Sequence, residues 1–134
     1  MNTFATRGQR MAQRAFARAE ARAGQKDYAS RAKSYPALIQ AAGLCQAAAF
    51  AQAKQPELLD DVAATMELDV ASGEDLARRA REAPAMEYLH LTRLALQAAV
   101  WIKRYVEALE RSVSTVATAP QASPETTDVE KQSS

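Results

Sequence analysis

The strongest periodic pattern of hydrophobic residues lies toward the C-terminal end of the chain. Seven residues there recur at alternating intervals of three and four, namely Tyr88, Leu91, Ala95, Ala98, Ile102, Tyr105 and Leu109. This spacing is a heptad seam, which lines one apolar stripe along a single α-helix. Leu94 and Trp101 widen the stripe into a broad packing face. The pattern predicts a long last helix, opened by Pro84, that packs against the rest of the protein.

Glycine, proline and capping residues divide the rest of the chain into shorter helical segments. Gly24 is suited to end the first helix, and Asp27 is placed to cap the next. Pro36 restricts the residue before it, so we expect the chain to bend at Tyr35 and a new helix to begin. Gly43 interrupts that helix, either in a left-handed conformation or as a point of close backbone approach.

Two further signals mark the helices that follow. Pro56 is placed as the first residue of a helix, and Ser72 to Asp75 have the S-x-x-[DE] form of a capping box. The expected helices run from about Thr3 to Ala23, Tyr28 to Ser34, Pro36 to Lys54 with the break at Gly43, Pro56 to Ala71, Ser72 to Ala83, and Pro84 onward.

An uncharged segment, SYPALIQAAGLCQAAAFAQAK, extends from Ser34 to Lys54 and contains no charge before its final lysine. Three glutamines, a proline and a glycine interrupt it, so it lacks the ~20 consecutive apolar residues of a membrane span. We interpret the segment as a core hairpin whose alanines let neighbouring helices approach closely. Phe50 is expected to be buried there.

The composition agrees with one helical domain. The chain has 134 residues, enough for one core, and contains no alternating Val/Ile/Thr run of strand length. From about Ser112 the sequence becomes rich in Ser, Thr, Pro and Glu, without periodicity. The sequence therefore predicts an all-α fold: a compact single-domain helical bundle of about five to six helices over residues 1–111, and a flexible C-terminal tail over residues 112–134.

Charge is distributed unevenly, although the net charge is only +1. From Arg7 to Lys33 there are eight Lys and Arg residues and two acids, whereas from Glu57 to Asp75 there are seven acids and no base. Such polarity indicates two faces that meet different partners or each other. Within the basic part, arginines fall at 7, 10, 14, 18 and 22 and share one stripe of the first helix. The opposing face, expected to be buried, contains Ala5, Ala12, Phe16, Ala19 and Ala23.

Candidate catalytic residues are few. His90 is the only histidine and Cys45 the only cysteine, so neither a zinc site nor a paired di-iron motif can be assembled from them. No glycine-rich phosphate loop is present, and no acid, base and nucleophile form a set. We therefore expect no enzyme activity, no metal and no cofactor. The single cysteine and the lack of an apolar N-terminal stretch favour a cytoplasmic protein, with no membrane partner.

The arginine stripe has three possible explanations. It could be a solvated helix face, but such faces usually mix charge signs. Five arginines on one stripe repel one another unless something anionic meets them. Phosphate groups are one candidate, because arginine binds them bidentately, and the acidic face of another subunit is the alternative.

The residues around the uncharged segment resemble a known family, the small helical subunit of the type III-B CRISPR effector called the Cmr complex. The matching residues are Tyr28, Lys33, Pro36, Ile39, Gly43, Leu44, Gln46, Ala49 and Phe50. Tyr88 and the stretch Trp101 to Tyr105 are also similar, so the resemblance covers roughly Met11 to Leu109. Ala42 and Cys45 depart from the family pattern, at positions that we interpret as packing positions.

The resemblance implies a non-catalytic subunit of an RNA-guided ribonucleoprotein in antiviral defence. It also implies that copies of the chain stack along the backbone subunits, near the large subunit, and face the crRNA–target RNA duplex. The expected contacts are to the RNA backbone and independent of sequence. The candidate RNA-binding residues are Arg14, Arg18, Arg22, Lys26, Arg31, Lys33, Lys103 and Arg104. The alternative is a purely structural helical adaptor whose basic stripe docks acidic protein surfaces.

Overall fold

The computed structural model describes residues 5–133, with side chains described as far as residue 112. It contains six α-helices and, within that range, no β-strand. The helices are α1 (Arg7–Ala21), α2 (Lys26–Ala42), α3 (Leu44–Lys54), α4 (Pro56–Thr65), α5 (Gly73–Glu82) and α6 (Ala85–Ser133). The predicted all-α fold class is confirmed.

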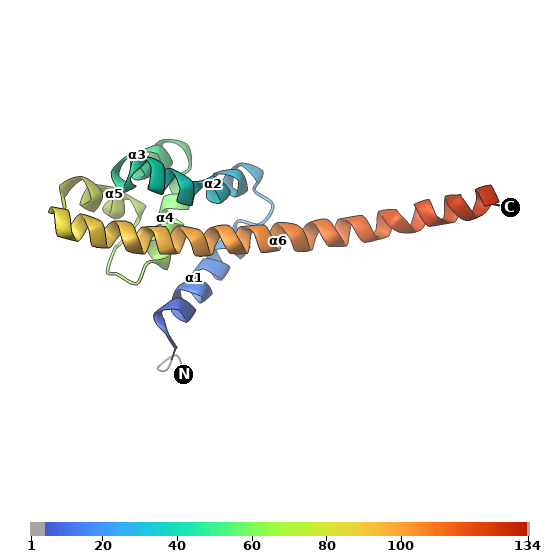
Figure 1. The fold of residues 1–134 in the computed structure, drawn as a ribbon, viewed down its shortest axis with the longest axis horizontal. Helices are drawn as coiled ribbons and strands as arrows, with labels where there is room; N and C mark the ends of the chain where they lie inside the picture. The colour runs from blue at the N-terminus through green and yellow to red at the C-terminus, as the bar shows by residue number, and fades with distance from the viewer. Residues whose placement is uncertain (1–4, 134) are drawn as a thin grey trace.

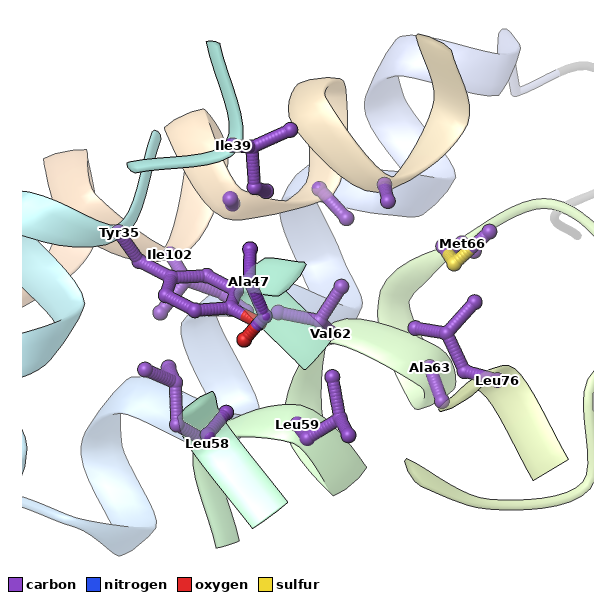
Figure 2. Close-up of a cluster of buried hydrophobic side chains, with 14 of the residues drawn as sticks. Tyr35, Ile39, Ala47, Leu58, Leu59, Val62, Ala63, Met66, Leu76 and Ile102 are labelled. Atoms are coloured by element: carbon purple, nitrogen blue, oxygen red, sulfur yellow. The ribbon is translucent and has the colours of Figure 1, made fainter. Parts of the chain in front are cut away.

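Helix α6 is the long axis of the molecule, and the other five helices gather around its first half (Figure 1). Helices α1 and α2 make the most extensive contacts with α6, while α5 packs mainly on α3 and α4. The buried cluster in Figure 2 draws side chains from α2 to α6, including Tyr35, Leu58, Leu76 and Ile102. The core is therefore continuous and is built across helices rather than within one hairpin.

The heptad seam of α6 lies where the sequence places it. Leu91, Ala95, Ala98 and Ile102 are fully buried, and the residues at both ends of the seam are partly buried against the same core. The seam thus turns one face of α6 toward α1 and α2. The opposite face of the helix remains open to solvent over the same residues.

The predicted bend at Pro36 is wrong, because α2 continues through this residue. The chain stays helical from Lys26 to Ala42 with Pro36 inside, so Tyr28 to Ser34 is not a separate helix. Proline removes one backbone donor and favours a break. Here Tyr28, Ala32, Tyr35 and Ile39 are buried along one side of α2, and burying this continuous apolar face outweighs the local cost.

The start of α2 and the α2–α3 junction refine two other expectations. Gln25 occupies the N-cap position of α2, and Asp27 lies in its first turn instead of capping it. Gly43 separates α2 from α3 at φ +89°, and a Cβ built there would lie 3.3 Å from Tyr88 Oη. Both proposed reasons for Gly43, a positive φ and a close approach, therefore apply.

Helix α4 ends at Thr65, six residues before the predicted end at Ala71. The connection that follows is held by hydrogen bonds from its backbone N–H groups to aspartate side chains. In a continued helix these N–H groups would bond to backbone carbonyls instead. Ala71 donates its N–H to Asp75 Oδ2 at 3.0 Å, and Gly73 donates to Asp60 Oδ1 at 2.8 Å. Ser72 caps α5 as predicted, since its Oγ accepts from the N–H of Asp75 at 3.1 Å.

The buried face of α1 differs from the prediction. Met11, Ala15 and Ala19 are buried, whereas Phe16 is 40% exposed and Ala23 is exposed. Phe16 instead lies beside α6, where its ring meets Tyr105 edge-on at 5.4 Å between ring centroids. The prediction is confirmed for Ala19 and wrong for Phe16 and Ala23, because α1 lies between α6 and α4 and is turned so that its arginines reach α4.

Two further expectations concern exposure and the C-terminal end. Phe50, predicted to be buried, is 41% exposed on α3, where alanines fill the tight contacts instead.

Helix α6 continues to Ser133, beyond the other helices (Figure 1). The flexibility of residues 112–134 stays a prediction, and Ser134 lies outside the described residues. Among the described residues, no helix has both the length and the apolar character needed to cross a bilayer.

Candidate functional site

The arginine stripe of α1 meets the acidic part of its own chain. Arg10 Nε lies 2.7 Å from Glu67 Oε1, and Arg14 pairs with the same carboxylate. Arg18 and Arg22 both pair with Asp61 of α4, at 3.4 and 3.0 Å. The two charged regions found in the sequence therefore face each other within one molecule. This contact neutralises most of the stripe, although Arg14 and Arg18 remain about half exposed.

Asp61 is the centre of the buried part of this contact. Its side chain has no exposed surface, and it accepts bonds from Arg22 Nε and Nη2 at 3.0 and 3.1 Å. Tyr28 Oη also donates to Asp61, and the Arg22 guanidinium lies 5.6 Å from the centroid of the Tyr28 ring. A buried carboxylate is tolerated only when it is paired and hydrogen-bonded in this way.

The pKa values of these partners follow from the same contacts. The hydrogen bond to Asp61 raises the pKa of Arg22, and burial, reinforced by the bond to Asp61, raises the pKa of Tyr28 above its ordinary value. The hydrogen bond from Arg10 lowers the pKa of Glu67 below that of a free glutamate, against a smaller opposing effect of burial. Near neutral pH, Arg22 is therefore positively charged, Tyr28 is neutral and Glu67 is negatively charged.

The other predicted RNA-binding residues lie on α2 and α6. Lys26 begins α2 and is exposed, and Lys33 Nζ pairs with Glu110 Oε1 of α6 at 2.8 Å. The guanidinium of Arg31 lies 5.9 Å from the centroid of the Phe50 ring, and its buried Nε has no hydrogen-bond partner within the described part of the chain. Lys103 is half-buried and Arg104 is exposed on α6. Arg22 and Lys26 line one pocket together with Glu110, the partner of Lys33.

A groove between α1 and α6 brings Arg7 of the α1 stripe together with Arg104 and the aromatic side chain of Trp101. It has a volume of about 360 Å³ and is lined by Arg7, Gly8, Met11, Leu96, Gln97, Val100, Trp101 and Arg104. Trp101 stacks on Tyr105, with ring centroids 5.8 Å apart and an interplanar angle of 16°. Arg7 was assigned to the stripe and Arg104 to α6. Only their helix crossing places them on one groove, which no spacing within a single helix reveals.

Candidate catalytic groups can also be placed. Cys45 is half-buried, and its backbone N–H donates to Tyr88 Oη at 3.1 Å. His90 is exposed on α6. Over the described residues, no three His, Cys, Asp or Glu side chains come close enough to hold a metal ion.

Comparison with known proteins identifies the family. The family described as CRISPR-associated protein (Cas_Cmr5) matches residues 7–109. This chain belongs to the Cmr5 family. A curated relative from Thermus thermophilus, "CRISPR system Cmr subunit Cmr5", is 39% identical over 111 residues, covering 78% of this chain and 96% of that protein. The crystal structure of a Cmr5 family protein from the same species has a TM-score of 0.71 and 37% identity, over 78% of this chain and 96% of that one.

The residues that carried the Cmr5 resemblance lie mostly in packing positions. Tyr28 bonds to Asp61, Leu44 is fully buried, and Gly43 gives the chain its positive φ between α2 and α3. Pro36 is buried inside α2. Gln46, Ala49 and Phe50 are the exceptions, since all three are exposed on α3. The ring of Phe50 lies under the guanidinium of Arg31. The motif of this Cmr5 chain therefore mainly encodes how α2, α3 and α4 fit together.

Proposed function

We propose that this protein is a non-catalytic small subunit of a type III-B CRISPR ribonucleoprotein, the Cmr complex, in antiviral defence. The observation that carries the proposal is the family match over residues 7–109, which includes all of α1 to α5 and the part of α6 that packs on them. The relative from Thermus thermophilus is named as a Cmr subunit. Such a complex would act in the cytoplasm.

In this role the subunit binds and positions rather than reacts. Copies would stack along the backbone subunits, beside the large subunit, and contact the target RNA of the crRNA–target duplex through its phosphates. Supporting this proposal, Lys26, Arg104 and part of Arg14 and Arg18 remain open to solvent. Contacts of arginine and lysine with phosphate carry affinity without sequence preference.

Isolation from the native host tests membership of the complex. A tagged copy of this chain, expressed at its normal level, is expected to retain crRNA together with the backbone and large subunits. The pure subunit alone, incubated with RNA and divalent metal, is expected to leave the RNA intact. Recovery of the chain without RNA or partner subunits would contradict the proposed membership, and metal-dependent cleavage by the pure chain would contradict the non-catalytic role.

One observation favours the alternative, a structural adaptor that docks acidic protein surfaces. The stripe of α1 already binds carboxylates, those of Asp61 and Glu67, and the same chemistry could serve between molecules. Salt titration separates the two functions. Phosphate contacts make the logarithm of the association constant fall linearly with the logarithm of the salt concentration, by about 0.7 per contact on a single strand. RNA binding that is absent, or independent of salt, would favour the adaptor.

A further inference from the structure

The exposed face of α6 presents arginines that the fold does not neutralise. Arg93, Arg104 and Arg111 are all exposed, at intervals of eleven and seven residues, and so share one side of the helix. Among the described side chains, none of the three pairs with a carboxylate. The α1 stripe differs sharply, because Asp61 and Glu67 take up four of its five arginines. Arg7, the fifth, is exposed and reaches the groove beside Arg104.

The lining of this groove defines what it can bind. Two guanidinium groups flank it, and none of its eight lining residues is acidic, so an anion is the complementary ligand. The remaining wall is largely apolar and includes Trp101, held in place by stacking on Tyr105. An anion joined to a flat, partly apolar group fits this combination, and a nucleotide unit of RNA is such a group. The volume of about 360 Å³ is within the range of small-ligand sites.

We propose that the α1–α6 groove receives one nucleotide of a single RNA strand, with its phosphate between Arg7 and Arg104 and its base or sugar against Trp101. The strand then continues along α6 toward Arg93 on one side and Arg111 on the other. At about 1.5 Å of rise per residue these arginines lie about 16 Å and 10 Å from Arg104 along the axis, a reach of a few nucleotides. The inference rests on the proposed RNA-contacting function and assigns it to Arg7 and α6 rather than to the four α1 arginines that pair with Asp61 and Glu67.

Binding of the full-length chain to fluorescein-labelled single-stranded RNA of mixed sequence, followed by anisotropy over a range of salt, tests the assignment. The double variant Arg7→Glu/Arg104→Glu is expected to weaken binding at least tenfold. It should also flatten the log–log salt slope by about 0.7, since the two arginines hold one phosphate and each phosphate contact on a single strand contributes about 0.7. Both residues are exposed, so the variant should fold normally. Arg81→Glu, an exposed arginine on α5, is the matched control and should have little effect on the slope.

A second variant tests the aromatic wall separately. Trp101→Leu is expected to weaken RNA binding roughly tenfold, because it removes the aromatic surface on which a base can stack. The salt slope should stay unchanged, because the variant keeps every phosphate contact. Its helical content and thermal unfolding should be checked, since Trp101 is half-buried.

The outcomes separate this inference from the proposed function. If the Arg7/Arg104 variant binds RNA as the wild type does, the groove is not the site, while RNA contact elsewhere on the chain stands. If that variant binds RNA normally but no longer co-purifies with the other subunits, the groove belongs to an acidic protein partner and the inference is overturned. If the wild-type chain shows no salt-dependent RNA binding, both this inference and the proposed RNA contact fail.

Discussion

Gly43 shows how a single residue joins two helices. Its backbone has φ +89° and ψ 158°, a region that residues with a Cβ rarely enter, at a cost of order 1–3 kcal/mol. A Cβ there would also lie 3.3 Å from Tyr88 Oη, the atom that accepts the N–H of Cys45. We therefore expect Gly43→Ala to lower the free energy of unfolding in urea by about 2–3 kcal/mol.

Gly24→Ala is the matched control. Gly24 also has a positive φ of +88°, but nothing lies within 4 Å of a Cβ built on it. Its substitution should therefore cost only the backbone strain, and less than Gly43→Ala. Equal losses for the two variants would mean that the contact with Tyr88 does not limit the junction.

The negative charge of Asp61 is expected to stabilise the folded protein. Asp61→Asn removes the charge that Arg22, Arg18 and Tyr28 all face while keeping the shape of the side chain. Hydrogen bonds to charged groups contribute about 1.5–3 kcal/mol, and a buried pair that loses one partner costs more. Since both arginines can turn to solvent, we expect a loss of about 2–3 kcal/mol by urea unfolding. Asp69→Asn, at an exposed position, should change stability little, and a comparable loss there would contradict this explanation.

The contact between α1 and the loop after α4 should make stability depend on pH. The hydrogen bond from Arg10 lowers the pKa of Glu67 in the folded state below its ordinary value of 4.5. The contribution of Glu67 is therefore fully present above about pH 4.5 and is lost as the pH falls through the lowered pKa. Glu67→Gln should cost about 0.5–1 kcal/mol at pH 7, because both arginines are partly exposed.

Thermal or urea unfolding between neutral pH and about pH 3 measures this effect. The difference between the wild type and Glu67→Gln is expected to shrink as the pH falls below 4.5. A difference that stays constant across this range would show that the ionised carboxylate does not hold α1 in place.

Element boundaries show what local sequence can and cannot predict. Spacing and capping chemistry, which act within a few residues, predicted α1, α3, α4 and α5, the heptad seam of α6 and the Ser72 cap. The continuity of α2 through Pro36 did not, because the deciding term is burial of Tyr35 and Ile39 against other helices. The early end of α4 likewise depends on Asp60 and Asp75, which bond to the backbone of the connection.

The candidate site was less predictable than the fold for the same reason. The stripe on α1 was visible in the sequence, but its partners Asp61 and Glu67 lie 39 or more positions further along the chain. The uneven charge along the chain indicates that the two charged regions could meet each other or other partners, but it does not decide between these pairings. Whether an arginine is free or neutralised depends on helix orientation, and this is what distinguishes Arg7 and Arg104 from Arg22.

At the scale of the whole molecule, α6 combines two roles on opposite faces. Its seam supports the core through Leu91, Ala95, Ala98 and Ile102, and its outer face presents arginines to solvent. A rigid helix holds those arginines at fixed intervals, which suits contact with a repeating backbone better than a loop would. The α1 stripe in turn fixes α1 against α4, so that Arg7 reaches the groove.

Truncation of the chain tests where the folded unit ends. The family match stops at residue 109, and Figure 1 shows α6 continuing beyond the other helices. A chain ending at Ser112 keeps the buried Val106 and the partly buried Leu109, so we expect its Tm to stay within about 2 °C of the full-length value. Its RNA affinity should also be unchanged, because Arg111 is retained.

A chain ending at Arg104 is the contrasting variant. It loses Tyr105, Val106 and Leu109 from the interface with α1 and α2, and its Tm should be much lower. A large fall in Tm for the Ser112 variant would show instead that residues 113–134 contribute to folding.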